Sequence, residues 1–238
     1  YGWTPDLPDH RDYLFTPRFT GPLPAKVDLR QGCPTVYDQG ELGSCTANAI
    51  AAALQFDQIK ENLPEIFLPS RLFIYYNERV MEGTVRQDAG AMIRDGIKSV
   101  ATVGAPHEAL WPYVVSKFAK KPPANAFKDA AKHPAITYSR VTPVLDQMKG
   151  CLADGYPFVF GFTVFASFES QQVAQTGHAP LPQPHERALG GHAVLAVGYD
   201  DADQTFIVRN SWGTSWGMAG YFTLPYAYLT NAQLADDF

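Results

Sequence analysis

The hydrophobic positions follow different patterns in the two halves of the chain. The segment from Cys45 to about Lys60 follows a Gly-Ser pair and is rich in alanine, which predicts a closely packed central helix. Two further helices are predicted, from Ser70 to about Met81 and from Gly90 to about Val100. The first half is therefore expected to be mainly helical.

After the proline pair at Pro122-Pro123, the apolar runs become short and rich in aromatic and β-branched residues. Phe158–Phe160, Ala193–Val197 and Phe206–Arg209 predict strands. Between the first two, the segment from Gln171 to Leu189 is polar and contains prolines, which is typical of a surface loop. The second half is expected to be mainly strand, and the fold class is α+β.

The first 25 residues show neither a helical nor an alternating pattern. They are rich in proline and aspartate and predict an extended arm. The arm also carries four aromatic residues that indicate packing on another part of the protein: Tyr1, Trp3, Tyr13 and Phe15. Two interpretations stay open, a tail attached to the surface and a remnant pro-segment lying near an active site.

Composition narrows the function classes. With 238 residues, 46% of them hydrophobic, the chain is long enough for one large domain or two small lobes. The net charge of -5 is spread along the chain without a Lys/Arg cluster, which argues against nucleic acid as a partner. Apolar runs such as Phe158–Phe165 are strand-length, so no membrane span is expected. The chain begins at Tyr1 without a methionine, which is compatible with an upstream signal peptide or pro-region.

The cysteines and histidines do not indicate a metal site. Three cysteines and six histidines lack ligand spacings such as Cys-x2-Cys or His-x3-His, so neither a metal nor a cofactor is expected. If one cysteine is a working thiol, Cys33 and Cys151 are either bridged to each other or both free. The sequence leaves both possibilities open.

Three segments carry candidate chemistry. Cys45 lies at the first turn of a predicted helix, where the partial positive charge favours a reactive thiolate. His192 stands where a glycine pair enters an apolar strand, and Asn210 follows a strand beside two tryptophans. An amide can orient an imidazole, and an indole can shield that bond from water. Each residue alone is more often structural, but the three together predict a thiol nucleophile, its base and an orienting amide.

These motifs give the sequence a specific resemblance to the papain family of cysteine peptidases, from Leu23 to Phe222. Val27-Asp28-Leu29-Arg30 is similar to the family's mature start, and Gln39 stands six residues before Cys45 as the family's oxyanion-hole glutamine does. Asn210-Ser211-Trp212-Gly213 matches the asparagine motif, and Glu108 with Trp111-Pro112-Tyr113 resembles another segment of these enzymes.

The resemblance implies a papain-like two-lobe fold, with a helical left lobe, an antiparallel β-barrel-like right lobe and the active-site cleft between them. We expect an N-terminal arm over residues 1–24 and a peptidase domain over 25–238. Its helical lobe would span about 35–120 and its β lobe about 121–238. By the same resemblance, Cys45 is the nucleophile, His192 its base and Asn210 the orienting residue, while Gln39 helps to hold the oxyanion.

The resemblance also indicates substrate-binding residues. Gly90 corresponds to a glycine strip, and the main pocket is expected to involve residues near Tyr226 and to prefer an apolar side chain. The full set of substrate-binding candidates is Gly90, Gly161, Gly191, Ala193 and Trp212. Leu42 and Thr46 depart from the family, which usually has a cysteine and an aromatic residue there. By the resemblance, Leu42 removes one familiar disulfide and Thr46 changes the packing beside the nucleophile. The opening segment from Gly2 to Asp9 and the sparse cysteines look most like a bacterial branch.

The expected function is therefore cysteine-type endopeptidase activity through a thioester intermediate, on protein or peptide substrates. Two alternatives are amide transfer by the same thiol and a catalytically silent binding module with this fold. The arm is a candidate occupant of the cleft, which would make the protein a zymogen. Family habit suggests a secreted or otherwise extracytoplasmic location.

Overall fold

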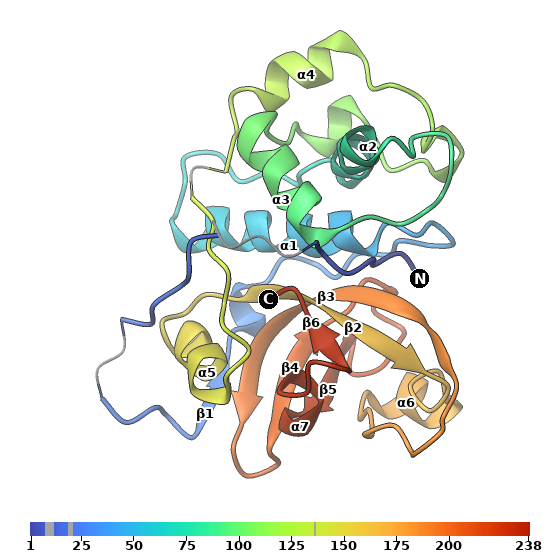
Figure 1. Cartoon of the computed structure of the whole chain (residues 1–238). Helices are drawn as coiled ribbons and strands as arrows, with labels where there is room; N and C mark the ends of the chain where they lie inside the picture. Colours follow the sequence, from blue (N-terminus) through green and yellow to red (C-terminus); the bar gives the residue numbers. More distant parts are fainter. Residues whose placement is uncertain (8–11, 19–20, 136) are drawn as a thin grey trace.

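Helices and strands occupy separate halves of the molecule (Figure 1). The computed structural model describes residues 1–7, 12–18, 21–135 and 137–238. The helical half contains α1 (Cys45–Lys60), α2 (Arg71–Glu82), α3 (Ile93–Thr102) and α4 (Ala124–Ala130), with the short 3-10 helices η2 (Glu108–Leu110) and η3 (Val115–Lys117). The strand half contains the sheet, the 3-10 helix η1 (Arg30–Gly32), α5 (Leu145–Ala153), α6 (Gln171–Thr176) and α7 (Tyr226–Leu229). The expected α+β arrangement with two lobes is confirmed.

The central helix α1 joins the two halves. It packs against α2 and α3 on one side and against the sheet on the other. Its alanines are buried on more than one face of the helix, at Ala47, Ala49, Ala51 and Ala52. Their small side chains let both halves of the molecule pack closely against the helix. Helix α3 begins at Ile93 and not at Gly90, since Gly90 has a positive φ of 73° and lies outside the helix.

Helix α4 extends the helical half beyond the expected division near residue 121. Phe127 of α4 packs edge-on against Phe73 of α2, with ring centroids 4.8 Å apart. Ala126 and Ala130 are buried in the same small cluster. The chain therefore crosses to the strand half only after α4.

The strand half is built on one antiparallel sheet in the order β5-β4-β3-β2-β6, with β1 paired to β3. The strands are β1 (Lys26–Asp28), β2 (Phe158–Phe165), β3 (Ala188–Asp200), β4 (Thr205–Arg209), β5 (Tyr221–Pro225) and β6 (Ala235–Asp236). Strands β5 and β6 end this order without pairing to each other among the described residues, so the sheet is open and not a closed barrel. Rings such as Phe160, Phe162 and Phe222 fill its core.

One sequence expectation is corrected here, and one alternative that the sequence left open is decided. The segment from Gln171 to Leu189 is not wholly a loop, because it contains α6 and the start of β3. The side chain of Ser170 accepts the N–H of Val173 and so caps α6. Of the two possibilities for the cysteines, the structure has free thiols, with Cys33 and Cys151 each next to a backbone carbonyl.

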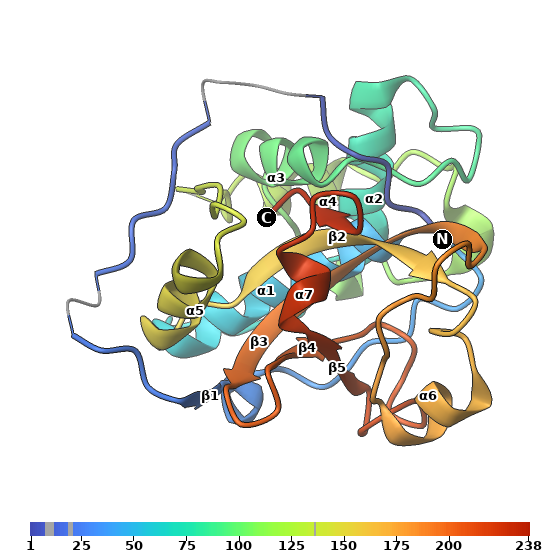
Figure 2. The same ribbon diagram turned by 60° about the horizontal axis from the view of Figure 1, so that its bottom comes forward.

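The described parts of the N-terminal arm run along the outside of the molecule from the junction of the halves to β1 (Figure 2). Trp3 is buried, whereas Tyr13 is 80% exposed. Phe15 pairs through its N–H with the carbonyl of Arg140. The aromatic residues thus attach the arm at some points only. Residues 8–11 and 19–20 of the arm, Pro8 among them, lie outside the described residues.

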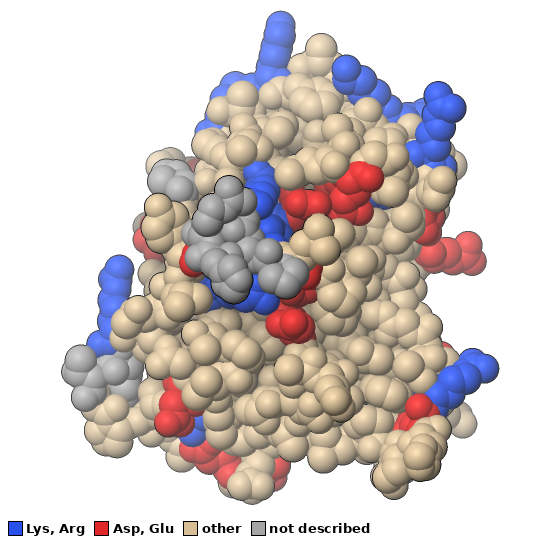
Figure 3. Space-filling model, in the orientation of Figure 1, with Lys and Arg blue, Asp and Glu red and all other residues tan. Residues whose placement is uncertain are grey.

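Charge is scattered over the face drawn in Figure 3, where Lys and Arg side chains project singly from the rim of the helical half. In the described part of the chain, no helix combines the length and hydrophobicity that a membrane crossing requires.

Candidate active site

Cys45 is the first residue of α1, and its side chain is completely buried. Burial raises the pKa of its thiol to about 11, while the backbone N–H groups of Ala193 and Gly2 next to the sulfur act in the opposite direction. Ala193 belongs to β3 and directly follows His192. The contact therefore brings the start of α1 in one half against β3 in the other.

His192 is held by Asn210, which directly follows β4. The Nε2–H of His192 donates to Oδ1 of Asn210 at 2.8 Å, and the same oxygen accepts the backbone N–H of Ser211 at 2.8 Å. Because Ser211 donates an N–H, the atom facing it is the amide oxygen and not the amide nitrogen. This fixes the proton on Nε2 and leaves Nδ1 of His192 as an acceptor. Nδ1 has no hydrogen-bond partner among the described residues.

The indole of Trp212 covers this pair. Its ring stacks on the His192 imidazole with centroids 4.9 Å apart and an interplanar angle of 26°. Burial lowers the pKa of His192 to about 4, although the bond to Asn210 favours the protonated form. In this structure the imidazole is therefore neutral at physiological pH.

Gln39 lies in the loop before α1 and is almost fully buried. Its Oε1 accepts the hydroxyl of Ser211 at 2.6 Å, and its Nε2 donates to the carbonyl of Leu42 at 2.9 Å. An amide nitrogen carries two N–H donors, so one remains for another acceptor. Ser211 thus connects Gln39 to the segment that contains Asn210.

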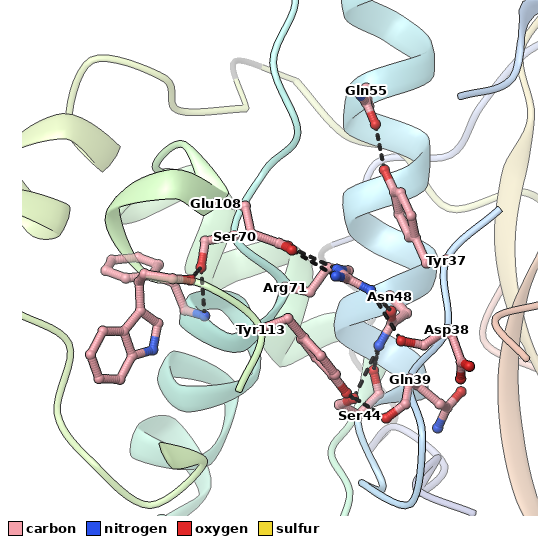
Figure 4. A network of polar contacts seen from close by, with 12 residues as sticks. Tyr37, Asp38, Gln39, Ser44, Asn48, Gln55, Ser70, Arg71, Glu108 and Tyr113 are labelled. Atoms are coloured by element: carbon pink, nitrogen blue, oxygen red, sulfur yellow. Dashed lines mark hydrogen bonds and ion pairs between the residues drawn. The ribbon is translucent and has the colours of Figure 1, made fainter. Parts of the chain in front are cut away.

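A buried polar network fixes the approach to Cys45 (Figure 4). The hydroxyl of Tyr113 donates to the carbonyl of Gln39 at 2.9 Å and contacts the hydroxyl of Ser44 at 2.5 Å. Nδ2 of Asn48, one turn into α1, donates to both the carbonyl and the hydroxyl of Ser44. The residue before Cys45 is thereby held from two sides.

Arg71 of α2 is the cation of this network. Its guanidinium makes a two-point ion pair with Glu108, at 2.6 and 2.8 Å, and lies 4.3 Å from the centre of the Tyr113 ring. It also donates to the carbonyl of Asp38 at 3.3 Å. The sequence singled out Glu108 and Tyr113 only by resemblance. The sequence analysis did not identify Arg71, Asn48 or the role of Ser211. These residues stand in ordinary helix or loop segments, and no motif or spacing around them indicates a function.

The first residues of the arm lie against these side chains. Gly2 accepts the N–H of Ala91 through its carbonyl at 2.7 Å, and Thr4 donates to the carbonyl of Ala91 at 3.1 Å. Trp3 donates its N–H to the carbonyl of Gly191 at 3.0 Å. The arm therefore forms backbone bonds to both halves, directly beside Cys45.

Trp3 fills a pocket whose wall requires glycine. A Cβ on Gly161 would lie about 2.0 Å from the indole, and a Cβ on Gly90 would lie 2.2 Å from the Gly2 carbonyl oxygen. The Nε1–H of Trp3 donates to the carboxylate of Asp237 at 3.0 Å. Gly90, Gly161 and Gly191, singled out from the sequence, thus all contact the arm.

The structure does not bring Tyr226 to the site that holds Trp3. Tyr226 lies beside the β3–β4 turn, where its hydroxyl donates to Asp201 at 2.7 Å and its ring packs on Phe206. The residue that reaches the Trp3 pocket is Asp237, which follows β6 close to the end of the chain. Resemblance alone did not indicate it, since the register of this divergent segment depends on the pairing of β6 with β2.

Comparison with known proteins agrees with this geometry. The family model described as papain family cysteine protease matches residues 23–236. The chain belongs to this family. In the solved structure of xylellain, a cysteine protease from Xylella fastidiosa, 48% of aligned residues are identical, and the match covers 100% of this chain and 94% of that one with a TM-score of 0.95. An uncharacterised peptidase C1-like protein of Acanthamoeba polyphaga mimivirus is 42% identical, over 100% of this chain and 85% of its own.

A more distant structure shares the fold alone. Digestive procathepsin L 3 of the Tenebrio molitor larval midgut is 20% identical, with a TM-score of 0.69 over 93% of this chain and 72% of that one. The expected membership of the papain family is confirmed, and the likeness to the Xylella fastidiosa enzyme fits a bacterial branch. This papain-family protein is a cysteine endopeptidase, a hydrolase of peptide bonds.

Proposed function

We propose that Cys45 is the nucleophile of this peptidase, His192 its general base and acid, and Asn210 the residue that orients the imidazole. The observation that carries the assignment is the bond from Nε2 of His192 to Asn210. It leaves Nδ1 as the proton acceptor, and Ala193 brings the same segment of β3 against the Cys45 sulfur. Two halves of the molecule thus contribute one catalytic pair.

The chemistry follows from these positions. The Cys45 thiol passes its proton to Nδ1 of His192, and the thiolate attacks the substrate carbonyl carbon. The backbone N–H of Cys45 and the free N–H of Gln39 stabilise the resulting oxyanion. His192 gives its proton to the leaving amine as the C–N bond breaks, and a thioester forms. Water then attacks the thioester carbonyl carbon while His192 takes one of its protons. The C–S bond breaks, the carboxylic acid product leaves, and His192 returns the proton to the Cys45 sulfur.

We further propose that the N-terminal arm is an internal inhibitor. Gly2 presents an N–H to the Cys45 sulfur, and its carbonyl is bound to Ala91 instead. A thiolate attacks a carbonyl carbon, so the arm blocks the cleft in a pose that does not favour its own cleavage at Gly2.

Burial by the arm also opposes formation of the catalytic ion pair. Burial raises the pKa of the Cys45 thiol and lowers that of the His192 imidazole, which keeps both groups neutral. Removal of the arm would readmit solvent and favour the thiolate and imidazolium forms. The arm would then act through electrostatics as well as by steric exclusion.

The pocket that holds Trp3 supports a proposal for substrate preference. Its apolar wall at Gly161 fits a large ring, which agrees with an apolar subsite, and Asp237 adds an acceptor at its base. An aromatic side chain with an N–H or O–H donor would satisfy both features. We expect tryptophan and tyrosine to be preferred over phenylalanine at this subsite.

For location, we propose residence outside the cytoplasm. Support comes from the distant likeness to a digestive procathepsin. The cysteines do not support this location, because Cys33, Cys45 and Cys151 are all free and form no disulfide. Fractionation of the native host would test the proposal, and recovery of the protein only from the cytoplasm would exclude it.

The catalytic assignment is tested by hydrolysis of a fluorogenic dipeptide amide under reducing conditions. Activity should disappear in Cys45→Ala and after treatment with an epoxide that alkylates thiols. Persistence of activity in Cys45→Ala would remove Cys45 from the mechanism. Added amines that outcompete water would indicate amide transfer. Absence of turnover in both the intact and the trimmed chain, with retained peptide binding, would indicate a silent binding module.

A further inference from the structure

A second group of chemically active side chains lies on the helical half, outside the residues assigned to catalysis. Among the described residues, His107, Asp129 and His133 bring their ligand atoms within 4.8 Å of one another. Asp129 belongs to α4, His133 follows that helix, and His107 comes from the segment before η2. Linear spacing did not indicate this group, because one imidazole comes from a distant part of the chain.

The distances fit a small tetrahedral cation. Oδ2 of Asp129 lies 2.7 Å from Nδ1 of His107, and Oδ1 of Asp129 lies 3.9 Å from Nε2 of His133. Ligands of a tetrahedral zinc ion, each roughly 2.0–2.1 Å from the metal, lie about 3.3 Å from one another. The two observed distances lie on either side of this value, and all the ligand atoms lie within 4.8 Å of one another, so the side chains would have to close by up to about 1.5 Å to bind one ion.

A fourth residue fixes the orientation of the His107 ring. Nε2 of His107 lies 2.9 Å from Glu65 and Nδ1 lies 2.7 Å from Asp129, so each ring nitrogen donates to a carboxylate. A zinc ion would displace the Nδ1 proton, while Glu65 would still accept the proton on Nε2. A carboxylate behind a metal-binding imidazole is the usual arrangement at zinc sites, where it sets the tautomer. Glu65 comes from the loop between α1 and α2, so three separate segments meet here.

Packing holds the two rings in place. Phe67 stacks on His107 with centroids 4.0 Å apart and also contacts His133 at 4.6 Å. Asp129 is held in turn by the backbone N–H of His107 at 3.1 Å and by the ammonium of Lys132 at 3.1 Å. Lys132 is largely exposed and can turn toward solvent when a cation arrives.

We propose that His107, Asp129 and His133 bind a zinc ion, with Glu65 as the supporting carboxylate and water as the fourth ligand. Two imidazoles and one carboxylate suit zinc better than calcium or magnesium, which prefer oxygen ligands. The ion would join the loop before η2 to α4. Since Glu108 follows His107 and pairs with Arg71, it would also brace the network around Ser44. This proposal does not depend on the catalytic assignment.

The test uses the full chain carrying Cys45→Ala, because a thiol beside an imidazole binds zinc as well. After chelation, zinc chloride is titrated and followed by calorimetry and thermal unfolding. We expect one zinc per chain and a Tm increase of roughly 5–10 °C at a free zinc concentration about a hundredfold above Kd. Cobalt(II) should give the visible bands of a tetrahedral site without the near-ultraviolet absorption of a thiolate ligand.

Matched variants decide whether the site is the one described. His107→Ala and His133→Ala should each abolish the Tm increase, and Glu65→Ala should weaken binding by about ten- to a hundredfold while leaving the stoichiometry unchanged. His178→Ala, in the strand half, serves as the control and should bind as the parent does. The proposal is overturned by a chain that zinc does not stabilise. Retained binding in either His107→Ala or His133→Ala also overturns it.

Discussion

The imidazole of His192 and the amide of Asn210 form a hydrogen bond of 2.8 Å whose polarity is fixed by a second donor, the N–H of the next residue. The bond joins adjacent strands through the residue that follows β4. It determines which nitrogen of the imidazole is left to accept a proton, and this orientation is the basis of the first prediction.

Asn210→Ala should lower kcat/KM on the order of a hundredfold, because the ring loses its fixed orientation. Steady-state kinetics across a range of pH would measure the effect. Asn210→Gln keeps an amide but displaces it, so it should be nearly as impaired. An alanine variant with parental kcat/KM would show that Trp212 alone orients His192.

Gln39→Ala should lower kcat by roughly a hundred- to a thousandfold without abolishing turnover, because one oxyanion donor is removed while the backbone N–H of Cys45 remains. KM should change little, which distinguishes loss of transition-state stabilisation from loss of binding. Ser211→Ala should have a smaller effect on kcat, because it removes only the hydrogen bond to Oε1 of Gln39 and keeps the Gln39 side chain. Undiminished kcat in Gln39→Ala would exclude Gln39 from the mechanism.

Removal of residues 1–24 should raise activity if the arm inhibits. The same effect, smaller in size, is expected for Trp3→Ala, because Trp3 fills the pocket and bonds both Gly191 and Asp237. Tyr13→Ala is the matched control, since Tyr13 is 80% exposed. Rates of alkylation of Cys45 by an epoxide should rise in parallel. Equal activity in intact and trimmed chains would count against the inhibitory role.

Asp237→Ala should reduce the preference for tryptophan over phenylalanine at the pocket. A hydrogen bond to a buried carboxylate is worth about ten- to a hundredfold, and the apolar contact at Gly161 is unchanged. The ratio of kcat/KM for matched peptide substrates on the trimmed chain measures this directly. If the ratio of kcat/KM for tryptophan over phenylalanine substrates is the same in Asp237→Ala as in the parent, the substrate side chain does not bind beside Asp237.

Because Glu78 is buried, we expect the free energy of unfolding to depend on pH. It is fully buried on α2 and accepts the hydroxyl of Thr46, the residue after the nucleophile. Burial raises its pKa from 4.5 to about 8, although the bond from Thr46 opposes this. Between these values the folded state keeps a proton that the unfolded state releases, so the free energy of unfolding falls as pH rises toward 8.

Glu78→Gln should remove this dependence. In the Cys45→Ala background, urea unfolding should give the variant a growing advantage over its parent between about pH 5 and pH 9. Below about pH 4.5 the two chains should be nearly equal. A difference that is constant with pH would mean that Glu78 is ionised in the folded state.

The Thr46–Glu78 pair also explains a departure from the family. The sequence has Thr46 where these enzymes usually carry an aromatic residue, and it predicted altered packing beside the nucleophile. In the structure Thr46 is buried and turned toward α2, where Glu78 accepts its hydroxyl. Sequence could not foresee this partner, because residues 46 and 78 meet only through the packing of two helices.

Local patterns along the chain were sufficient to predict several parts of this protein. The alanine-rich run gave α1 with both its ends correct, at Cys45 and Lys60. Apolar runs located β2, β3 and β4, and the order of Cys45, His192 and Asn210 along the chain predicted thiol chemistry. These features depend on neighbours along the chain, for which periodicity, helix propensity and motif spacing are sufficient.

Tertiary structure alone decided which distant groups meet. It put Trp3 on Asp237, 234 residues later, turned Arg71 toward Glu108 and brought His107 to Asp129. It left the thiols of Cys33 and Cys151 free and opened the sheet that resemblance had suggested as a barrel. Such contacts depend on strand register and on the packing of whole elements, and no local spacing records them.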